Sequence, residues 1–344
     1  MDGECAKVSS KSCQWQVLSV ECLCQVINKL IRTFRKSYVR NPPEILDLSG
    51  VIFLTNPKAP FNHKPIANRK GVQMNNKYKR EIVLWEIIFP LFIYYFLHLI
   101  IMIIARDFIG AGSENYMLCQ IIADIVTIPV IYFLIYRKSK NIFRAYDPDT
   151  KTRIIDLAVI IVMFALISFG LNNVIVMSPL VDMSAGYAQA NEGFYGSLLG
   201  IELVGSGILA PLLEELVFRG IVYGSLRKLL GVWQSVVISA LIFAAVHFNI
   251  VQFVYAFIVG IVLAITMECI GNVYGAIAGH MTANIFAVLR TELGLFSGLT
   301  DKSLSAWCIS LGILICGTAV MIMWQNRQGN LYQKEVQFNI FRQI

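Results

Sequence analysis

The chain has 344 residues, of which 56% are hydrophobic and 15% charged, and its mean hydropathy is +0.63. An ordinary soluble domain carries about 25% charged residues, so the composition excludes that class and indicates a chain that lies mainly in a lipid bilayer. The net charge of +7 comes from the N-terminal region. It indicates membrane orientation and contact with anionic lipid headgroups rather than nucleic-acid binding, for which no module is visible.

Residues 1–80 differ from everything that follows, with 14 Lys and Arg against 5 Asp and Glu. We expect them to form a basic cytoplasmic extension made mostly of linker or disordered chain. Apolar residues recur at helical spacing within 23–34, between basic residues, which predicts an interfacial helix; a poorly ordered tail is the equal alternative. No signal-peptide core is visible at the start.

Met74, followed by basic residues and then an apolar run, is typical of a bacterial start. One hypothesis is therefore that residues 1–73 are an extension of the gene model rather than part of the native protein. A peptide from upstream of Met74, found in the native protein by mass spectrometry, would refute it.

Eight apolar runs of roughly 20 residues follow, the length that a helix needs to cross about 30 Å of hydrocarbon. The runs are continuously apolar and lack period-two alternation, which favours helices over a β-barrel. We therefore expect an all-α, polytopic membrane protein of about eight transmembrane helices, with the active site inside the helix bundle. The membrane domain covers 81–326, and 327–344 form a C-terminal tail. The runs lie at 82–105, 117–136, 154–177, 195–213, 233–248, 251–268, 273–289 and 304–324.

Charges between the runs predict the orientation, because Lys and Arg gather in cytoplasmic loops. The segment 137–153 carries 6 Lys and Arg against 2 Asp and Glu, whereas 106–116 and 178–194 are slightly acidic. We therefore expect an integral membrane protein of the bacterial cytoplasmic membrane with both termini in the cytoplasm. The eight cysteines include no paired CxxC spacing that would suggest zinc.

The most informative stretch is PLLEELVFRG, residues 211–220, in which two carboxylates and an arginine interrupt an apolar helix. Ionisable side chains in a span are costly and usually pair or line a cavity. Glu215 and Arg219 are i,i+4 neighbours that can neutralise one another. Glu214 points about 100° away and is left to act as a general base or acid. The alternative is a surface salt bridge at the end of the span.

Two further polar elements follow in the next spans. Phe243-Ala-Ala-Val-His247 ends one apolar run, and a lone histidine there is more often packed than catalytic. His280 and Asn284 stand one turn apart on one helix face and can together donate hydrogen bonds to a developing oxyanion. The alternative for this pair is polar contact between helices.

Taken together, the three elements predict hydrolysis. A carboxylate and an imidazole can deprotonate and orient a water, and the His/Asn pair can stabilise a tetrahedral oxyanion, which describes the cleavage of an amide. No Ser/His/Asp grouping and no GxSxG elbow is evident, so a covalent serine mechanism is not favoured.

The ordered motifs EExxxR (Glu214, Glu215, Arg219), FxxxH (Phe243, His247) and HxxxN (His280, Asn284) resemble the signature of the CPBP family of intramembrane proteases. That family takes in the CAAX prenyl endopeptidases and the bacterial bacteriocin-processing and immunity homologues, also called Abi proteins. The resemblance covers roughly 201–289, and residues 1–80 have no counterpart in it.

The resemblance implies that Glu214 and His247 activate the hydrolytic water and that His280 and Asn284 form the oxyanion hole. Glu215, Arg219 and Phe243 would surround the site, with the Glu215–Arg219 pair orienting His247. It also favours a mechanism without a metal. Zinc stays open as the alternative cofactor, because Glu214, His247 and His280 would make a His₂Glu ligand set.

The expected substrate is a membrane-associated peptide or protein cut near the cytoplasmic leaflet, and bacterial relatives imply peptide maturation or bacteriocin self-immunity. The alternatives are a membrane scaffold or immunity partner that works through contacts, and a transporter, since intramembrane carboxylates also mark ion paths. Some polar residues in the spans can line a cavity, but span ends and packing explain them as well. They are His98, Asp124, Asn172, Asn173, Glu202 and Glu268.

Overall fold

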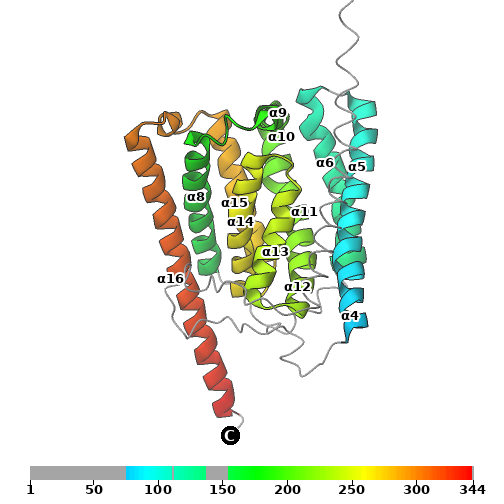
Figure 1. Cartoon of the computed structure of the whole chain (residues 1–344), viewed down its shortest axis with the longest axis vertical. Helices are drawn as coiled ribbons and strands as arrows, with labels where there is room; N and C mark the ends of the chain where they lie inside the picture. Colours follow the sequence, from blue (N-terminus) through cyan, green and yellow to red (C-terminus); the bar gives the residue numbers. More distant parts are fainter. Residues whose placement is uncertain (1–74, 111, 137–153, 343–344) are drawn as a thin grey trace, which may run out of the picture. The chain divides into compact units, whose positions relative to one another are not determined.

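A computed structural model describes residues 75–110, 112–136 and 154–342 (Figure 1), and every regular element in these ranges is a helix. The all-helical fold confirms the predicted fold class. The predictions for residues 1–74 and for the basic segment 137–153 lie outside the described residues. The predicted C-terminal tail, 327–344, is helical as far as Arg342, since the final helix, α16, runs from Leu304 to Arg342.

Several helices contain π-helical turns, labelled η, in which the backbone is wider than in an α-helix; η6 is a 3₁₀ turn. The elements are α4 (Asn76–Glu81), η1 (Ile82–Ile88), α5 (Phe89–Ile109), α6 (Ser113–Val130), η2 (Ile131–Tyr136), α8 (Ile154–Met177), α9 (Ala185–Phe194), α10 (Leu199–Val204), η4 (Gly205–Leu209), α11 (Ala210–Glu215), η5 (Leu216–Tyr223), α12 (Gly224–Leu229), α13 (Val232–Ala245), α14 (Ile250–Ile270), α15 (Tyr274–Glu292), η6 (Ser297–Thr300) and α16 (Leu304–Arg342).

Each of the eight predicted runs falls on a helix, but fewer than eight of these helices qualify as membrane spans. Within the described residues, 5 are long and apolar enough to cross a bilayer, and a sixth is added if the pair Gly186–Phe194 and Leu199–Leu229, bent by 103°, counts as one span. The helix α13 has only 14 residues, about 21 Å at 1.5 Å per residue, and α15 is interrupted by polar side chains. The chain is therefore a polytopic membrane protein whose span count, by length and composition, is lower than predicted.

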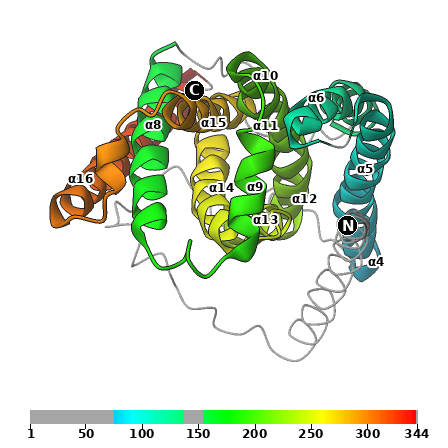
Figure 2. The same ribbon diagram turned by 90° about the horizontal axis from the view of Figure 1, so that it is seen from above.

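The helices pack through small residues where two backbones approach closely. The helix α8 lies against both α15 and α16, and α13 lies against α14 (Figures 1 and 2). A Cβ atom added to Gly279 of α15 would stand 2.4 Å from the ring of Phe164 on α8, and one added to Gly170 would stand 2.7 Å from the main chain of Leu314 on α16. Side chains larger than glycine would force these helices apart.

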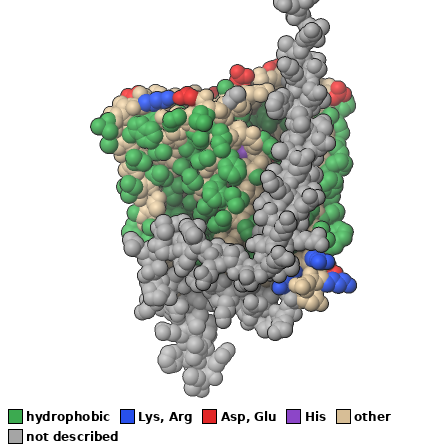
Figure 3. All heavy atoms as spheres, in the orientation of Figure 1, with side chains coloured by type: hydrophobic (Ala, Val, Ile, Leu, Met, Phe, Trp, Pro, Cys, Tyr) green, Lys and Arg blue, Asp and Glu red, His purple; other side chains and the backbone are tan. Residues whose placement is uncertain are grey.

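The surface of the described part is that of a protein in lipid. Figure 3 shows hydrophobic side chains covering the middle of one face, with charged side chains at its upper rim and at the lower end of α4. Large apolar side chains are exposed along α5 and α16, among them Phe92 (56%) and Ile315 (67%). Basic residues cluster at the end of α4, where Lys79 and Arg80 occupy its last turn.

Candidate active site

The two adjacent glutamates end α11, and Arg219 follows in the wide π-helical segment η5. Such segments are rare and occur frequently at functional sites. Pro211 lies inside the continuous helix Leu199–Leu229, just after the wide π-helical segment η4, and it supplies no N–H to the helix there. The helix therefore carries three ionisable side chains through the interior of the bundle.

Glu215 links the first motif to the third. Its Oε1 accepts a hydrogen bond from Arg219 at 2.8 Å and another from Nδ1 of His280 at 2.8 Å. The Arg219 guanidinium also donates to the main-chain oxygen of Gly260 on α14 at 3.3 Å. Both members of the ion pair are fully buried, so each compensates a charge that would be costly alone.

This arrangement differs from the predicted role of the pair. Glu215 orients His280 rather than His247, since its hydrogen bond is with the histidine of α15. The i,i+4 spacing correctly placed Arg219 beside Glu215, but spacing within one helix cannot tell which histidine from another helix meets the carboxylate.

Glu214 is the accessible carboxylate of the two. Its side chain is 22% exposed, against 0% for Glu215. Its Oε2 lies 3.7 Å from Nε2 of His280, which is beyond hydrogen-bond distance but close enough for electrostatic attraction. Glu214 is therefore partly accessible, whereas Glu215 is fully buried and uses its Oε1 for both donors.

His247 lies just past the end of α13, and its tautomer follows from its contact. Its Nδ1 is 2.9 Å from the main-chain oxygen of Phe243. A carbonyl oxygen can only accept, so Nδ1 carries the hydrogen and Nε2 of the neutral ring is left as an acceptor. That nitrogen is suited to accept a hydrogen bond from a water.

Phe243 forms the packing centre of the site. Its ring is 2% exposed and meets the rings of His247 (centroids 5.0 Å apart) and His280 (5.7 Å) in edge-to-face contacts. The Arg219 guanidinium carbon lies 4.3 Å from the centroid of the same ring. One aromatic side chain therefore contacts the arginine and both imidazoles and helps to fix their orientation.

Asn284 is held by the helix of the first motif. Its Nδ2 donates to the main-chain oxygen of Ser206, in η4, at 2.8 Å. An amide nitrogen carries two hydrogens, so one remains to bind a second acceptor. His280 and Asn284 thus face the segment that carries Glu214, one turn apart on α15.

The zinc alternative requires three protein donors around one point at about 2.0–2.2 Å from the metal. In the described part of the chain no group of three His, Cys, Asp or Glu side chains is placed to hold a metal ion. The side chains present do not form a zinc centre in this arrangement.

The other polar residues of the spans separate into two kinds. Three of them make interhelical or capping contacts. Glu268 accepts hydrogen bonds from Arg227 (3.0 and 3.1 Å) and from the Tyr223 hydroxyl (2.6 Å). Asn173 donates to Ser310 (3.1 Å), and Glu202 accepts from the main-chain N–H of Ser197 (3.0 Å). In contrast, His98 and Asp124 form a pair at 3.1 Å between α5 and α6, on helices that carry none of the motifs.

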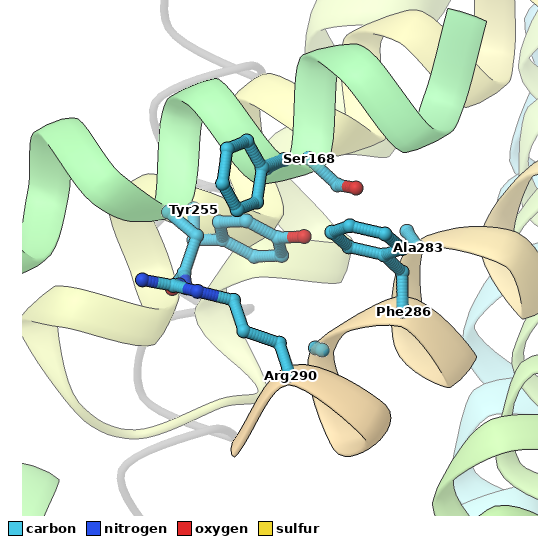
Figure 4. A pocket seen from close by; sticks show the side chains of 8 residues that line it. Ser168, Tyr255, Ala283, Phe286 and Arg290 are labelled. Carbon is cyan, nitrogen blue, oxygen red and sulfur yellow. The ribbon is translucent and has the colours of Figure 1, made fainter. Parts of the chain in front are cut away.

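A separate pocket lies between α8, α14 and α15, where the Tyr255 hydroxyl points toward Ser168 and Phe286 (Figure 4). The Arg290 guanidinium carbon lies 5.2 Å from the ring centroid of Phe169, beside Asn172, which also lines the pocket. The volume of this pocket, about 10 Å³, has room for one water molecule. The pocket is too small to hold a peptide.

A comparison with family models matches residues 196–286 to the type II CAAX prenyl endopeptidase Rce1-like family. No curated protein and no solved structure matches the chain. The matched segment runs from before α10 into α15 and contains all three motifs together with the buried Glu215–Arg219 pair. Residues 196–286 of this polytopic membrane chain are therefore similar to the Rce1-like type II CAAX prenyl endopeptidases, a family of peptide-bond hydrolases.

Proposed function

We propose that the chain is an endopeptidase that cuts a membrane-associated peptide or protein with a water activated by Glu214 and His247. The observation that carries the proposal is the contrast between the two glutamates. Glu215 is fully buried and holds Arg219 and His280, whereas the neighbouring Glu214 is 22% exposed and faces His280 across 3.7 Å. One carboxylate is thus fixed in the structure and the other is available for chemistry.

The reaction needs one water and one peptide bond. Glu214 takes a proton from the water while Nε2 of His247 accepts a hydrogen bond from it, and the water oxygen attacks the carbonyl carbon. The carbonyl oxygen gains the negative charge. When the C–N bond breaks, Glu214 returns the proton to the leaving amine, so it acts first as base and then as acid.

The developing oxyanion is bound by His280 and Asn284. Because Glu215 holds Nδ1 of His280, only Nε2 can donate to the substrate, and this requires the doubly protonated ring. The positive charge of that ring is balanced by Glu214 before Glu214 takes the proton from the water, and by the oxyanion afterwards. Asn284 contributes its second amide hydrogen, since the first is used by Ser206. Such fixed donors are aimed at the charge of the transition state.

The position of Glu214 along its helix indicates the class of substrate. Glu214 stands within the segment Leu199–Leu229, about 15 residues from either end and so roughly 20 Å along the helix from each. A chain that reaches it must enter the membrane domain, which favours a peptide anchored in the bilayer. In the bacterial cytoplasmic membrane, peptide maturation or self-immunity to a bacteriocin are the roles that we infer.

We infer that both termini lie in the cytoplasm. The basic residues of α4 lie at one end of the bundle. At the other end lie the start of α6 and the connections from α8 to α9 and from α15 to α16 (Figure 1), which carry the exposed acidic residues Glu114, Asp182 and Asp301. Loops rich in Lys and Arg stay on the cytoplasmic side.

The test compares peptides inside and outside cells of the native organism, of a deletion strain and of strains carrying Glu214→Gln or Glu292→Gln at normal protein level. Glu292 is an exposed carboxylate at the end of α15 and serves as the matched control. We expect one processed peptide to vanish from the deletion and Glu214→Gln strains but to persist with Glu292→Gln. If Glu214→Gln behaves like wild type while the deletion has an effect, the chain works as a scaffold and not as a protease.

A further inference from the structure

A polar cluster lies on two helices that the family match does not cover. Tyr95 and His98 stand three residues apart on one face of α5, and Asp124 and Thr127 do so on one face of α6. The two helices pack together, and Nε2 of His98 lies 3.1 Å from Oδ1 of Asp124. An ionisable pair at this depth is costly and usually serves a function.

The cluster contains polar atoms that lack partners. Asp124 is 1% exposed and Thr127 is 0% exposed. Among the described residues, no hydrogen bond reaches Oδ2 of Asp124, Oγ1 of Thr127 or the buried hydroxyl of Tyr95. Buried polar atoms are nearly always paired, and lipid offers no replacement. These three atoms therefore indicate a polar ligand that the cluster would bind.

One helix of the cluster lies beside the helix that carries Glu214. The helix α6 packs against α11, which carries Glu214 (Figure 2). Glu214 interacts electrostatically with Asp124 and with Tyr94 and Tyr95. The centroid of the Tyr94 ring lies 6.2 Å from that of Phe218, in an edge-to-face contact, and 6.0 Å from that of His98. The cluster therefore lies within electrostatic range of Glu214.

An extended substrate needs such groups. A peptide can be cut only where its chain is unwound, and each unwound residue exposes a main-chain N–H and C=O that the membrane interior leaves unpaired. The proposed oxyanion hole serves the carbonyl of the scissile bond alone. Residues on either side of that bond need their own acceptors and donors.

We propose that Tyr95, His98, Asp124 and Thr127 form a substrate-positioning site that binds main-chain groups of the peptide next to the scissile bond. Oδ2 of Asp124 accepts a main-chain N–H, and the Tyr95 hydroxyl donates to a main-chain carbonyl. This inference rests on the proposed protease function. It assigns α5 and α6, which carry none of the three motifs, to substrate recognition.

Tyr95→Phe and Thr127→Val test the site with little structural disturbance, because each removes a hydroxyl that has no partner among the described residues. The probe is a synthetic copy of the peptide that the comparison of strains identifies. We expect KM to rise about tenfold for each variant, with kcat within about twofold, since binding is lost equally from ground and transition states. Thermal unfolding should stay at the wild-type temperature or rise.

Asp124→Asn locates the contact along the peptide. A series of peptides carries an ester in place of one amide at each position near the scissile bond, which deletes a single N–H. At one position the ester should raise KM about tenfold for the wild type and not further for Asp124→Asn; at the others both enzymes should respond alike. The matched control is Asp156→Asn, a buried aspartate on α8 that accepts from Trp324 and Gln328. It should show no such position.

The results separate the two proposals. If Glu214→Gln is inactive while Tyr95→Phe, Thr127→Val and Asp124→Asn keep the wild-type KM for every peptide, the cluster holds water only and the positioning site is refuted alone. If Glu214→Gln cleaves like wild type, the protease function fails and the positioning site fails with it.

Discussion

Replacing Glu215 by glutamine removes the one charge that joins Arg219 to His280. Both donors bind the same oxygen, Oε1, so the amide oxygen of glutamine at that position can still accept from both, and the substitution removes the negative charge rather than the acceptor. Arg219 stays fully buried without its counter-charge, and the Gly260 carbonyl remains as a further acceptor. Breaking a buried ion pair on one side costs about 3–5 kcal/mol, and we expect Glu215→Gln near the lower value because that acceptor remains.

The double variant Glu215→Gln with Arg219→Met separates stability from activity. Removing both charges relieves the unpaired arginine, so we expect most of the lost stability to return. Cleavage should stay reduced about 10²-fold in both variants, because His280 no longer has a carboxylate on Nδ1 to hold its doubly protonated form.

The assay follows unfolding of the purified protein in mixed micelles as denaturing detergent is added, together with cleavage of the identified peptide at a temperature where each variant is folded. If Glu215→Gln unfolds at the same detergent concentration as wild type, the buried Glu215–Arg219 ion pair does not stabilise the protein as argued. A double variant that regains activity as well as stability would show that Glu215 does not act through His280.

Four further outcomes are expected. Asn284→Ala should lower kcat about 10²–10³-fold with little change of KM, because it deletes a donor to the oxyanion; steady-state kinetics checks this, and an effect on KM alone would contradict it. Gly279→Ala should destabilise the protein by about 1–3 kcal/mol, since the new Cβ would stand 2.4 Å from the buried Phe164 ring. The control Gly298→Ala, which places its Cβ in open space, should leave the stability unchanged. Detergent-induced unfolding compares the two variants. Glu268→Gln should destabilise the protein by about 3 kcal/mol by leaving the buried Arg227 without its bidentate partner, while kcat of the folded fraction stays unchanged. In a variant without native cysteines, an impermeant maleimide should label Asp301→Cys from outside the cell and Lys77→Cys only after the membrane is opened, and the reverse pattern would overturn the orientation.

Much of the fold was predictable because lipid leaves few alternatives. Long apolar runs without alternation can satisfy their backbone only as helices, and each predicted run is helical in the structure. The number of spans was less predictable. The short α13 and the polar α15 fall below the length or apolarity of a span, and protein neighbours can cover such helices where lipid does not.

The candidate site was predictable to the level of residue types and local spacing. The i,i+4 rule places Arg219 beside Glu215, and the two ordered histidines point to the same region. The partner of each histidine was not predictable, because the Glu215–His280 contact joins residues 65 positions apart. The pairing of His98 with Asp124 gave no sequence signal either, since each is a lone polar residue in an apolar run.

The central claim is that Glu214 carries the hydrolysis. Its most direct test is cleavage of the identified peptide by purified wild type, Glu214→Gln and Glu292→Gln in lipid vesicles, with products measured by mass spectrometry. The account predicts a rate for Glu214→Gln at least about 10³-fold below wild type, unchanged stability, and wild-type cleavage by Glu292→Gln. A folded Glu214→Gln protein that cuts the same bond within a few-fold of the wild-type rate would contradict it.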